Sequence, residues 1–401
     1  MKDFIKRNKF IIILFCFSFL LRLVYVLFVD TPIISDFKVM YDASQELING
    51  TSNYKDMPYF IIWGYQIGHV IYQTILLSIY NSVLFLKVVN CIISSLTVVF
   101  VYLLCNKVSS NKSSKVISIL YILFPFPLYM NSVLSNQQLP LLLILIALYL
   151  FVSIDYSKFI RKSLIIGCLL GLSNILRSEV IVIIGSLFIF SLFLIKIYGF
   201  KKIVISFMLI IITYLFVFKG CSYILKVSNI SPNGLSNLNP NWKFVIGFNY
   251  ETSGMYSESD ASIYAYNSDL SKKEVLNRIK DYKKIPLLFL KKTKILWLNS
   301  DLYWPIGHMD NTLFYKISNI INQFYIYLFI VLSIISFKKL FKNKIQLLIF
   351  IILFLYFGTY LLIEVMPRYA YNLQVFEAIL CSVGLDVIFS LKKNVQDVKH
   401  S

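Results

Sequence analysis

The chain has 401 residues, of which 58% are hydrophobic, and a mean hydropathy of +0.72. A soluble domain is close to half apolar and intersperses those residues with polar ones, whereas here they form runs of about twenty residues, which is bilayer length. The formal net charge of +19 does not indicate nucleic-acid binding, because the lysines lie at the ends of the apolar runs, where topology signals belong. We therefore predict an all-α polytopic membrane protein, with residues 1–401 forming a single membrane domain.

The N-terminal sequence MKDFIKRNKF is basic and then apolar, with no small-residue cleavage site after it. We interpret it as the start of an uncleaved first helix rather than a signal peptide. About ten apolar runs are long enough to span a membrane. They cover roughly residues 10–29, 84–105, 116–133, 138–154, 163–177, 179–195, 203–219, 318–336, 345–364 and 371–390.

The stretch from Tyr59 to Tyr80 is also apolar, and its assignment fixes the orientation of every later span. If it does not span, twenty Lys and Arg residues at the ends of the spans fall on the cytoplasmic side; if it spans, sixteen of them move outside. Basic residues favour the cytoplasmic side. We therefore predict that 59–80 is interfacial or re-entrant, that both termini are cytoplasmic, and that 30–83 and 220–317 are extracytoplasmic loops.

The first of these loops begins with several acidic residues. Apolar and aromatic residues at helical spacing predict an amphipathic, interfacial helix over 36–48, with Ser35 as its N-cap. Asp42 and Glu46 lie four residues apart on its solvated face. Asp36 lies in the first turn, where the helix dipole stabilises a carboxylate and where it could accept a proton from a hydroxyl group. The alternative is that Asp36 only stabilises the helix start.

The second loop contains two predicted helices. A capping-box pattern from Ser271 to Glu274 predicts a helix over 272–284. Pro286 begins another, over 286–298, which is too short and too charged to span and is predicted to be interfacial. Its Lys291 and Lys294 are candidates for binding a phosphate, and generic attraction to anionic lipid is the alternative.

The cysteines and histidines indicate no cofactor. The six cysteines have no paired spacing, and none of the three histidines has a metal-ligand spacing with a cysteine. A divalent metal is possible, but no motif indicates one. The abundance of Ile, Lys, Asn, Phe and Tyr is typical of proteins from AT-rich bacterial genomes.

Several short motifs occur in a defined order along the chain. They are Leu20-Leu21-Arg22-Leu23; Ser35-Asp36-Phe37; Gly171-Leu172-Ser173-Asn174-Ile175-Leu176-Arg177; Gly247-Phe248-Asn249 with Gly254; Pro286 with Lys294 and Trp297; and Glu364 with Pro367, Arg368 and Tyr369. This order, together with the predicted topology, resembles the membrane glycosyltransferases of the GT-C class. It is most similar to the branch of protein O-mannosyltransferase-like and aminoarabinose-transferase-like enzymes, glycosyltransferase family 39.

This resemblance implies an inverting transferase that takes a sugar from a polyprenyl-phosphate donor. The acceptor, not identified by the sequence, would lie on the extracytoplasmic face and be a cell-envelope glycan, lipid or protein. Asp36 falls on the catalytic aspartate of the first outer loop. The donor phosphate would be held by basic residues, and Glu364 and Tyr369 would orient them. The candidate phosphate-binding residues are Arg368, Arg22, Arg177, Lys291 and Lys294.

The chain departs from the family pattern at three places. Many relatives have an acid after the catalytic aspartate, where this chain has Phe37. Many have Ser-Glu at the start of the fourth span, where this chain has Ser135-Asn136, and many have Pro where Ser178 stands.

Two other function classes remain open from the sequence. One is a flippase or exporter of a lipid-linked glycan, although matched halves with broken helices and charges near the membrane midplane are not visible. The other is a noncatalytic partner in a wall-assembly complex. For Arg368, an alternative to phosphate binding is a local salt bridge with Glu364, four residues earlier.

Overall fold

The computed structural model describes residues 2–155, 158–298, 302–340 and 342–399. Within these ranges, eight helical segments are long and apolar enough to cross a membrane. They are α1 (Lys2–Phe28), α5 (Val83–Val108), α9 (Phe159–Leu176), α10 (Val180–Tyr198), α11 (Phe200–Val227), α17 (Leu313–Ser336), α18 (Lys344–Leu362), and η5 (Pro367–Tyr369) continuing into α19 (Ala370–Lys399).

The two remaining predicted spans differ from a straight membrane helix. The segment predicted at 116–133 is α6 (Asn111–Leu123) followed by α7 (Pro125–Tyr129) and η3 (Met130–Ser132), with a bend of 59°. Pro125 explains the bend, because proline disfavours a helical conformation in the residue before it, and Phe124 is extended. The segment predicted at 138–154 is the shorter α8 (Gln138–Val152). The predicted all-α polytopic fold is confirmed.

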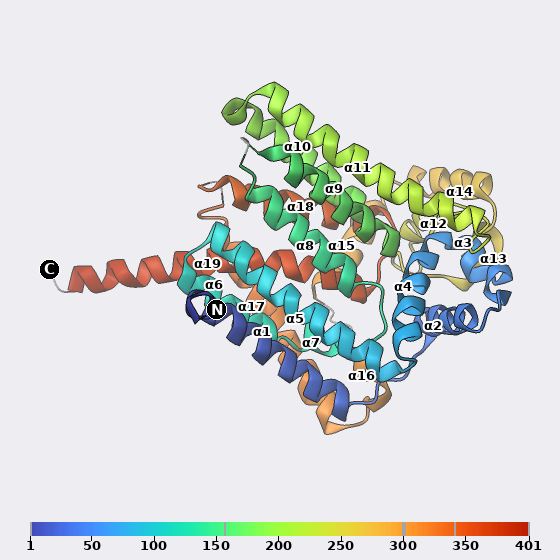
Figure 1. Cartoon of the computed structure of the whole chain (residues 1–401), viewed down its shortest axis with the longest axis horizontal. Helices are drawn as coiled ribbons and strands as arrows, with labels where there is room; N and C mark the ends of the chain where they lie inside the picture. The colour runs from blue at the N-terminus through green and yellow to red at the C-terminus, as the bar shows by residue number, and fades with distance from the viewer. Residues whose placement is uncertain (1, 156–157, 299–301, 341, 400–401) are drawn as a thin grey trace.

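A layer of short helices covers one end of the bundle (Figure 1). Figure 1 also shows that α1 begins and α19 ends at the opposite end. The stretch 59–80 belongs to the layer and is divided into short helices, as expected for a segment that does not span. The short helices between α1 and α5 are α2 (Ser35–Ile48), η1 (Asn53–Asp56), α3 (Pro58–Ile62), η2 (Gly64–Gln66) and α4 (Ile67–Ile79). Those between α11 and α17 are α12 (Trp242–Gly247), α13 (Glu258–Tyr264), α14 (Ser268–Lys280), α15 (Ile285–Trp297), α16 (Tyr303–Ile306) and η4 (Gly307–Met309).

Both helix caps predicted from the sequence are wrong. Ile34 occupies the cap position of α2 without a side-chain cap, and Ser35 has a left-handed φ of 53°. A side-chain cap needs extended backbone at the capping residue, which Ser35 does not have. Helix α14 is capped by Asn267, whose side chain accepts hydrogen bonds from Asp269 N and Leu270 N. Ser271 lies inside α14 and donates its hydroxyl to the Tyr264 carbonyl at 2.9 Å.

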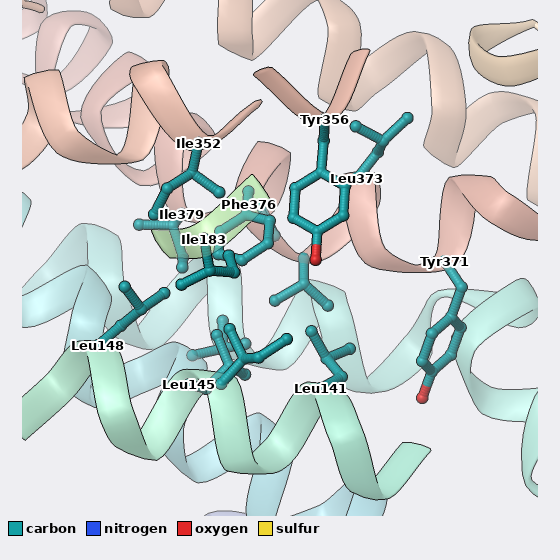
Figure 2. Packing of buried hydrophobic residues seen from close by; sticks show 14 of the residues in the cluster. Leu141, Leu145, Leu148, Ile183, Ile352, Tyr356, Tyr371, Leu373, Phe376 and Ile379 are labelled. Carbon is teal, nitrogen blue, oxygen red and sulfur yellow. The ribbon is translucent and has the colours of Figure 1, made fainter. Parts of the chain in front are cut away.

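The core of the bundle lies where α8, α10, α18 and α19 meet. Figure 2 shows aliphatic side chains of α8 facing Ile183 of α10 and aliphatic and aromatic side chains of α18 and α19. Tyr356 and Phe376 stack with ring centroids 5.9 Å apart. Because lipid tails are as apolar as leucine, close packing rather than removal from water holds such helices together.

Two glycines set the position of the short helices against the bundle. A Cβ atom on Gly68 of α4 would lie 1.8 Å from the Ile175 carbonyl oxygen near the end of α9. A Cβ atom on Gly247 of α12 would lie 2.3 Å from the Leu362 carbonyl oxygen at the end of α18. Only glycine permits these approaches. They bring α4 and α12 beside the ends of spanning helices, where the candidate site forms.

Candidate active site

A cavity of about 330 Å³ lies between the layer of short helices and the bundle. Residues from the start of α2, from α3 and η2, from the α9–α10 turn, from α12 and from the α18–α19 connection line it. Its lining combines aromatic rings with acidic and basic side chains. Those of this kind are Asp36, Phe37, Tyr59, Trp63, Tyr65, Arg177, Glu179, Lys243, Tyr256, Trp304, Glu364, Arg368 and Tyr369.

Asp36 and Arg368 form an ion pair in this cavity, although they are 332 residues apart in the chain. Arg368 Nη2 donates to Asp36 Oδ2 at 2.9 Å. The guanidinium lies 4.7 Å from the centre of the Trp304 ring and 5.1 Å from that of Phe37. Gln137 donates to the Arg368 carbonyl at 3.0 Å and fixes the backbone of η5. Phe37 and Gln137 thus both support Arg368.

The two partners differ in exposure. The side chain of Asp36 is 37% exposed, whereas that of Arg368 is 10% exposed. The buried guanidinium of Arg368 therefore holds the carboxylate of Asp36 in place, and the carboxylate stays accessible from the cavity. The preceding residue, Ser35, has a left-handed backbone, which is uncommon for a residue other than glycine and clusters at functional sites. This arrangement leaves a positioned carboxylate that can accept a proton from a hydroxyl group.

A second ion pair lies on the other side of the cavity. Arg177 Nε donates to Glu179 Oε1 at 2.6 Å, and Arg177 Nη1 donates to Asn136 Oδ1 at 2.8 Å. Asn372 donates to the other Glu179 oxygen at 2.6 Å. Burial alone would lower the pKa of Arg177, but the charge of Glu179 raises it above the ordinary value. The charge of Arg177 is therefore neutralised locally by Glu179.

The salt bridge between Glu364 and Arg368, which was the alternative to phosphate binding by Arg368, does not form. Met366 is extended before Pro367, so the two residues do not lie one turn apart on a helix. Glu364 instead accepts a hydrogen bond from the Tyr369 hydroxyl at 3.0 Å. Its backbone N–H donates to the Lys243 carbonyl at 3.0 Å. Glu364 and Tyr369 both line the cavity, as does Arg368.

Lys243 lines the cavity but was not singled out from the sequence. It lies in α12, and its ammonium is 5.3 Å from the ring centres of both Trp63 and Tyr65. The short helix α12 carries no motif that points to a phosphate. The sequence signal lay in its neighbours instead. The stretch 59–80, which includes Trp63 and Tyr65, is aromatic and polar, and this composition indicates a segment that does not face lipid.

Three predicted phosphate-binding residues do not line the cavity. Arg22 is buried in α1 and donates to the Ser18 carbonyl and hydroxyl at 3.3 and 2.5 Å. Lys291 and Lys294 are exposed on α15. Lys292, between them, is buried and donates to the carbonyls of Gly247, Leu361 and Ile363 at 3.0, 2.7 and 2.6 Å. It therefore fastens the segment that leads to Glu364.

The carboxylates of the cavity do not converge on one point. Asp36, Glu179 and Glu364 each bond to a different partner: Arg368, Arg177 and Tyr369. In the part of the chain that the structure describes, no group of three or more His, Cys, Asp or Glu side chains is placed to hold a metal ion.

Comparison with known proteins reveals similarity at the level of structure. No protein-family model matches the chain, and no curated protein matches it. Among solved structures, it is similar to the oligosaccharyltransferase of Archaeoglobus fulgidus tethered to an acceptor peptide containing the NVT sequon. The TM-score is 0.58 at 12% identity, over 97% of this chain and 50% of that chain.

Two other structures from the same organism are also similar. One is the archaeal oligosaccharyltransferase AglB in complex with an inhibitory peptide and a dolichol-phosphate, with a TM-score of 0.58 at 12% identity over 99% and 52% of the two chains. The other is the oligosaccharyltransferase complex with Zn and sulfate, with a TM-score of 0.55 at 14% identity over 94% and 49%. The chain spans about half the length of these proteins. At this identity the comparison establishes the fold alone, which this chain shares with the membrane part of the compared oligosaccharyltransferase structures that it covers.

Proposed function

We propose that the protein is an inverting glycosyltransferase of the protein O-mannosyltransferase-like and aminoarabinose-transferase-like branch. It transfers a sugar from a polyprenyl-phosphate donor to a hydroxyl group of an acceptor in the bacterial cell envelope. The observation that carries the proposal is the partly exposed carboxylate of Asp36, held at the cavity by Arg368. The GT-C fold supports it, because a similar structure was solved with a dolichol-phosphate.

In this reaction Asp36 accepts the proton of the acceptor hydroxyl. The hydroxyl oxygen attacks the anomeric carbon from the face opposite the phosphate, and the bond between that carbon and the phosphate oxygen breaks. The bonding electrons leave with the phosphate, which stays on the lipid. Arg368 fixes the base and adds positive charge to the cavity as the negative charge of the leaving group develops.

Transfer by the purified protein tests this proposal. The protein in nanodiscs is incubated with undecaprenyl phosphate carrying a radiolabelled hexose, N-acetylhexosamine or pentose, and envelope fractions supply the acceptor. We expect the label to leave the lipid and enter the acceptor fraction. Movement of intact labelled lipid between leaflets without cleavage would instead identify a flippase, and neither activity would indicate a noncatalytic role.

We also propose that the layer of short helices faces outside the cytoplasm, with both termini inside. The distribution of basic residues supports this orientation, and α1 begins at the same end of the bundle as α19 ends. In a cysteine-free background, exposed cysteines at Ser52 and Ser259 should react with a membrane-impermeant reagent in intact cells. Cysteines at Arg161 and Lys201, exposed at the other end, should react only after permeabilisation. The reverse pattern would overturn the orientation.

A further inference from the structure

Lys292 is a buried lysine of α15 that caps the ends of two other helices. Its ammonium donates to the carbonyl oxygens of Gly247, Leu361 and Ile363 at 3.0, 2.7 and 2.6 Å. Gly247 ends α12, and the other two residues lie at the end of α18. Carbonyl groups at the end of a helix have no partner within that helix. An ammonium has three N–H donors, so each donor of Lys292 satisfies one of these carbonyls.

The segment that Lys292 holds leads directly into the cavity. The backbone N–H groups of Glu364 and Val365 donate to the carbonyls of Lys243 and Gly254 at 3.0 and 2.9 Å. Gly254 packs so closely on Lys292 that a Cβ atom there would lie 2.8 Å from Cε of the lysine. Lys292 therefore contacts both the connection that carries Glu364 and the turn against which this connection packs.

The same connection sets the geometry around Arg368. Glu364 accepts a hydrogen bond from the Tyr369 hydroxyl at 3.0 Å, and Tyr369 follows Arg368 in η5. Arg368 in turn holds the carboxylate of Asp36. A shift of Glu364 would therefore pass through Tyr369 to the ion pair. Small misplacements of reacting groups are costly, since about 1 Å can reduce a rate by about 10²-fold.

The charge of Lys292 is stabilised by carbonyls rather than by an ion pair. Among the described residues, no carboxylate oxygen lies within 4.0 Å of its ammonium. Burial lowers the pKa of Lys292 to about 7, and the charge of Glu364 opposes this shift only in part. Of the other charged groups nearby in the fold, Lys243 and Arg368 line the cavity, whereas Glu251 and the other lysines of α15 are exposed. Lys292 therefore loses its proton near neutral pH, and the neutral amine has one N–H donor fewer than there are carbonyls to satisfy.

We propose that Lys292 is a positioning residue whose protonated form holds Glu364, Tyr369 and Arg368 in the geometry that transfer requires, so that turnover falls as Lys292 loses its proton. This inference rests on the proposed function, because transfer is the property that Lys292 controls. Lys292 does not line the cavity and acts through Glu364, without contact with donor or acceptor.

The pH dependence of turnover at saturating donor tests the proposal in nanodiscs. The protonated fraction of a group with a pKa of about 7 falls about tenfold between pH 6 and pH 8, and we expect wild-type turnover to fall by the same factor. Lys292→Arg stays charged and should keep its turnover up to pH 8. Lys292→Met should have about tenfold lower turnover than the wild type at pH 6 and no further fall at pH 8. Lys294→Met, exposed on the same helix, is the matched control and should reproduce the wild-type profile.

Hydrogen exchange provides a second readout that does not depend on transfer. We expect the protection of the Glu364 and Val365 amides, corrected for the intrinsic effect of pH, to fall about tenfold over the same range in the wild type and to stay constant in Lys292→Arg. Constant wild-type turnover over this range, or the same fall in Lys292→Arg as in the wild type, would overturn the positioning role. If neither variant folds, constant protection in the wild type overturns it. Absence of transfer at every pH, with protection that still falls, would overturn the proposed function but support the anchoring of Glu364 by Lys292.

Discussion

Two partly shielded arginines, one in the layer of short helices and one at the start of the last spanning segment, show how differently the same side chain can be used. Arg278, on α14, donates to both oxygens of Asp260 at 2.9 and 2.8 Å, to Glu274 at 2.7 Å and to the Val245 carbonyl at 2.8 Å. Arg368, on η5, makes a single bond to Asp36 at 2.9 Å. Its Nη1 atom is buried and has no hydrogen-bond partner among the described residues.

This difference separates a charge network that is satisfied internally from one that faces the cavity. Around Arg278 both carboxylates and the guanidinium are satisfied by each other, so the network joins α12, α13 and α14. The Arg368 side chain bonds to only one carboxylate oxygen among the described residues. It otherwise lies beside aromatic rings and the cavity. Incompletely satisfied charges beside a cavity are where binding and catalysis are found. The predictions below test this division between the two arginines.

Asp36→Asn should produce the largest effect. The substitution preserves shape but removes the proton acceptor, so we expect transfer to fall by about 10²–10⁴-fold. Expression and the unfolding temperature should stay close to wild type, because the asparagine oxygen can still accept the hydrogen bond from Arg368. Asp42→Asn, on the exposed face of the same helix, is the matched control and should keep its activity. Wild-type transfer by Asp36→Asn would remove Asp36 from the mechanism.

Arg278→Met should act on stability instead. It leaves Asp260 and Glu274 without their shared partner, and removing one member of a buried ion pair costs about 3–5 kcal/mol. We expect a lower unfolding temperature, measured in nanodiscs, but near wild-type transfer per folded molecule below that temperature. A variant that stays stable and loses its activity would contradict the division, because it would place Arg278 in the functional network.

Arg368→Lys should lower transfer by about 10–100-fold while the charge is retained. A lysine can still pair with Asp36, but it lacks the planar guanidinium that stacks on Trp304 and Phe37, and so it positions the carboxylate less well. The turnover rate at saturating donor is the measurement, since a positioning defect affects turnover more than donor binding. Lys291→Met, an exposed lysine of α15, should leave turnover unchanged. Unchanged turnover in Arg368→Lys would overturn the positioning role.

The smallest effect concerns acid stability. Burial alone would raise the pKa of Asp260, but hydrogen bonds from Arg278 and Asn249 outweigh it and hold the pKa below the ordinary 3.8. The stability that this shift provides is present above about pH 3.8 and is lost as the pH falls through the lower folded-state value. Wild type should therefore be more stable than Asp260→Asn at neutral pH, with the gap narrowing below pH 3.8. A gap independent of pH would contradict this.

Several features could be predicted from local sequence. The apolar runs gave the membrane helices, because hydropathy over a bilayer length is a property of consecutive residues. Helical spacing after Ser35 gave α2, and Pro286 gave α15 within a residue of its observed start. Caps were predicted less well: Asn267 rather than Ser271 begins α14, because many polar residues in that loop could serve as caps.

The sequence by itself determined that the chain crosses a membrane many times, and it pointed to Asp36, Arg177, Glu364, Arg368 and Tyr369, which all line the cavity. Only the tertiary structure decided which charges meet. It paired Arg368 with Asp36 rather than with Glu364, buried Arg22 in the bundle, and brought Lys243 to the cavity. The reason is physical: hydropathy and helical spacing act over neighbouring residues, whereas an ion pair depends on where the packing of distant helices places its two ends.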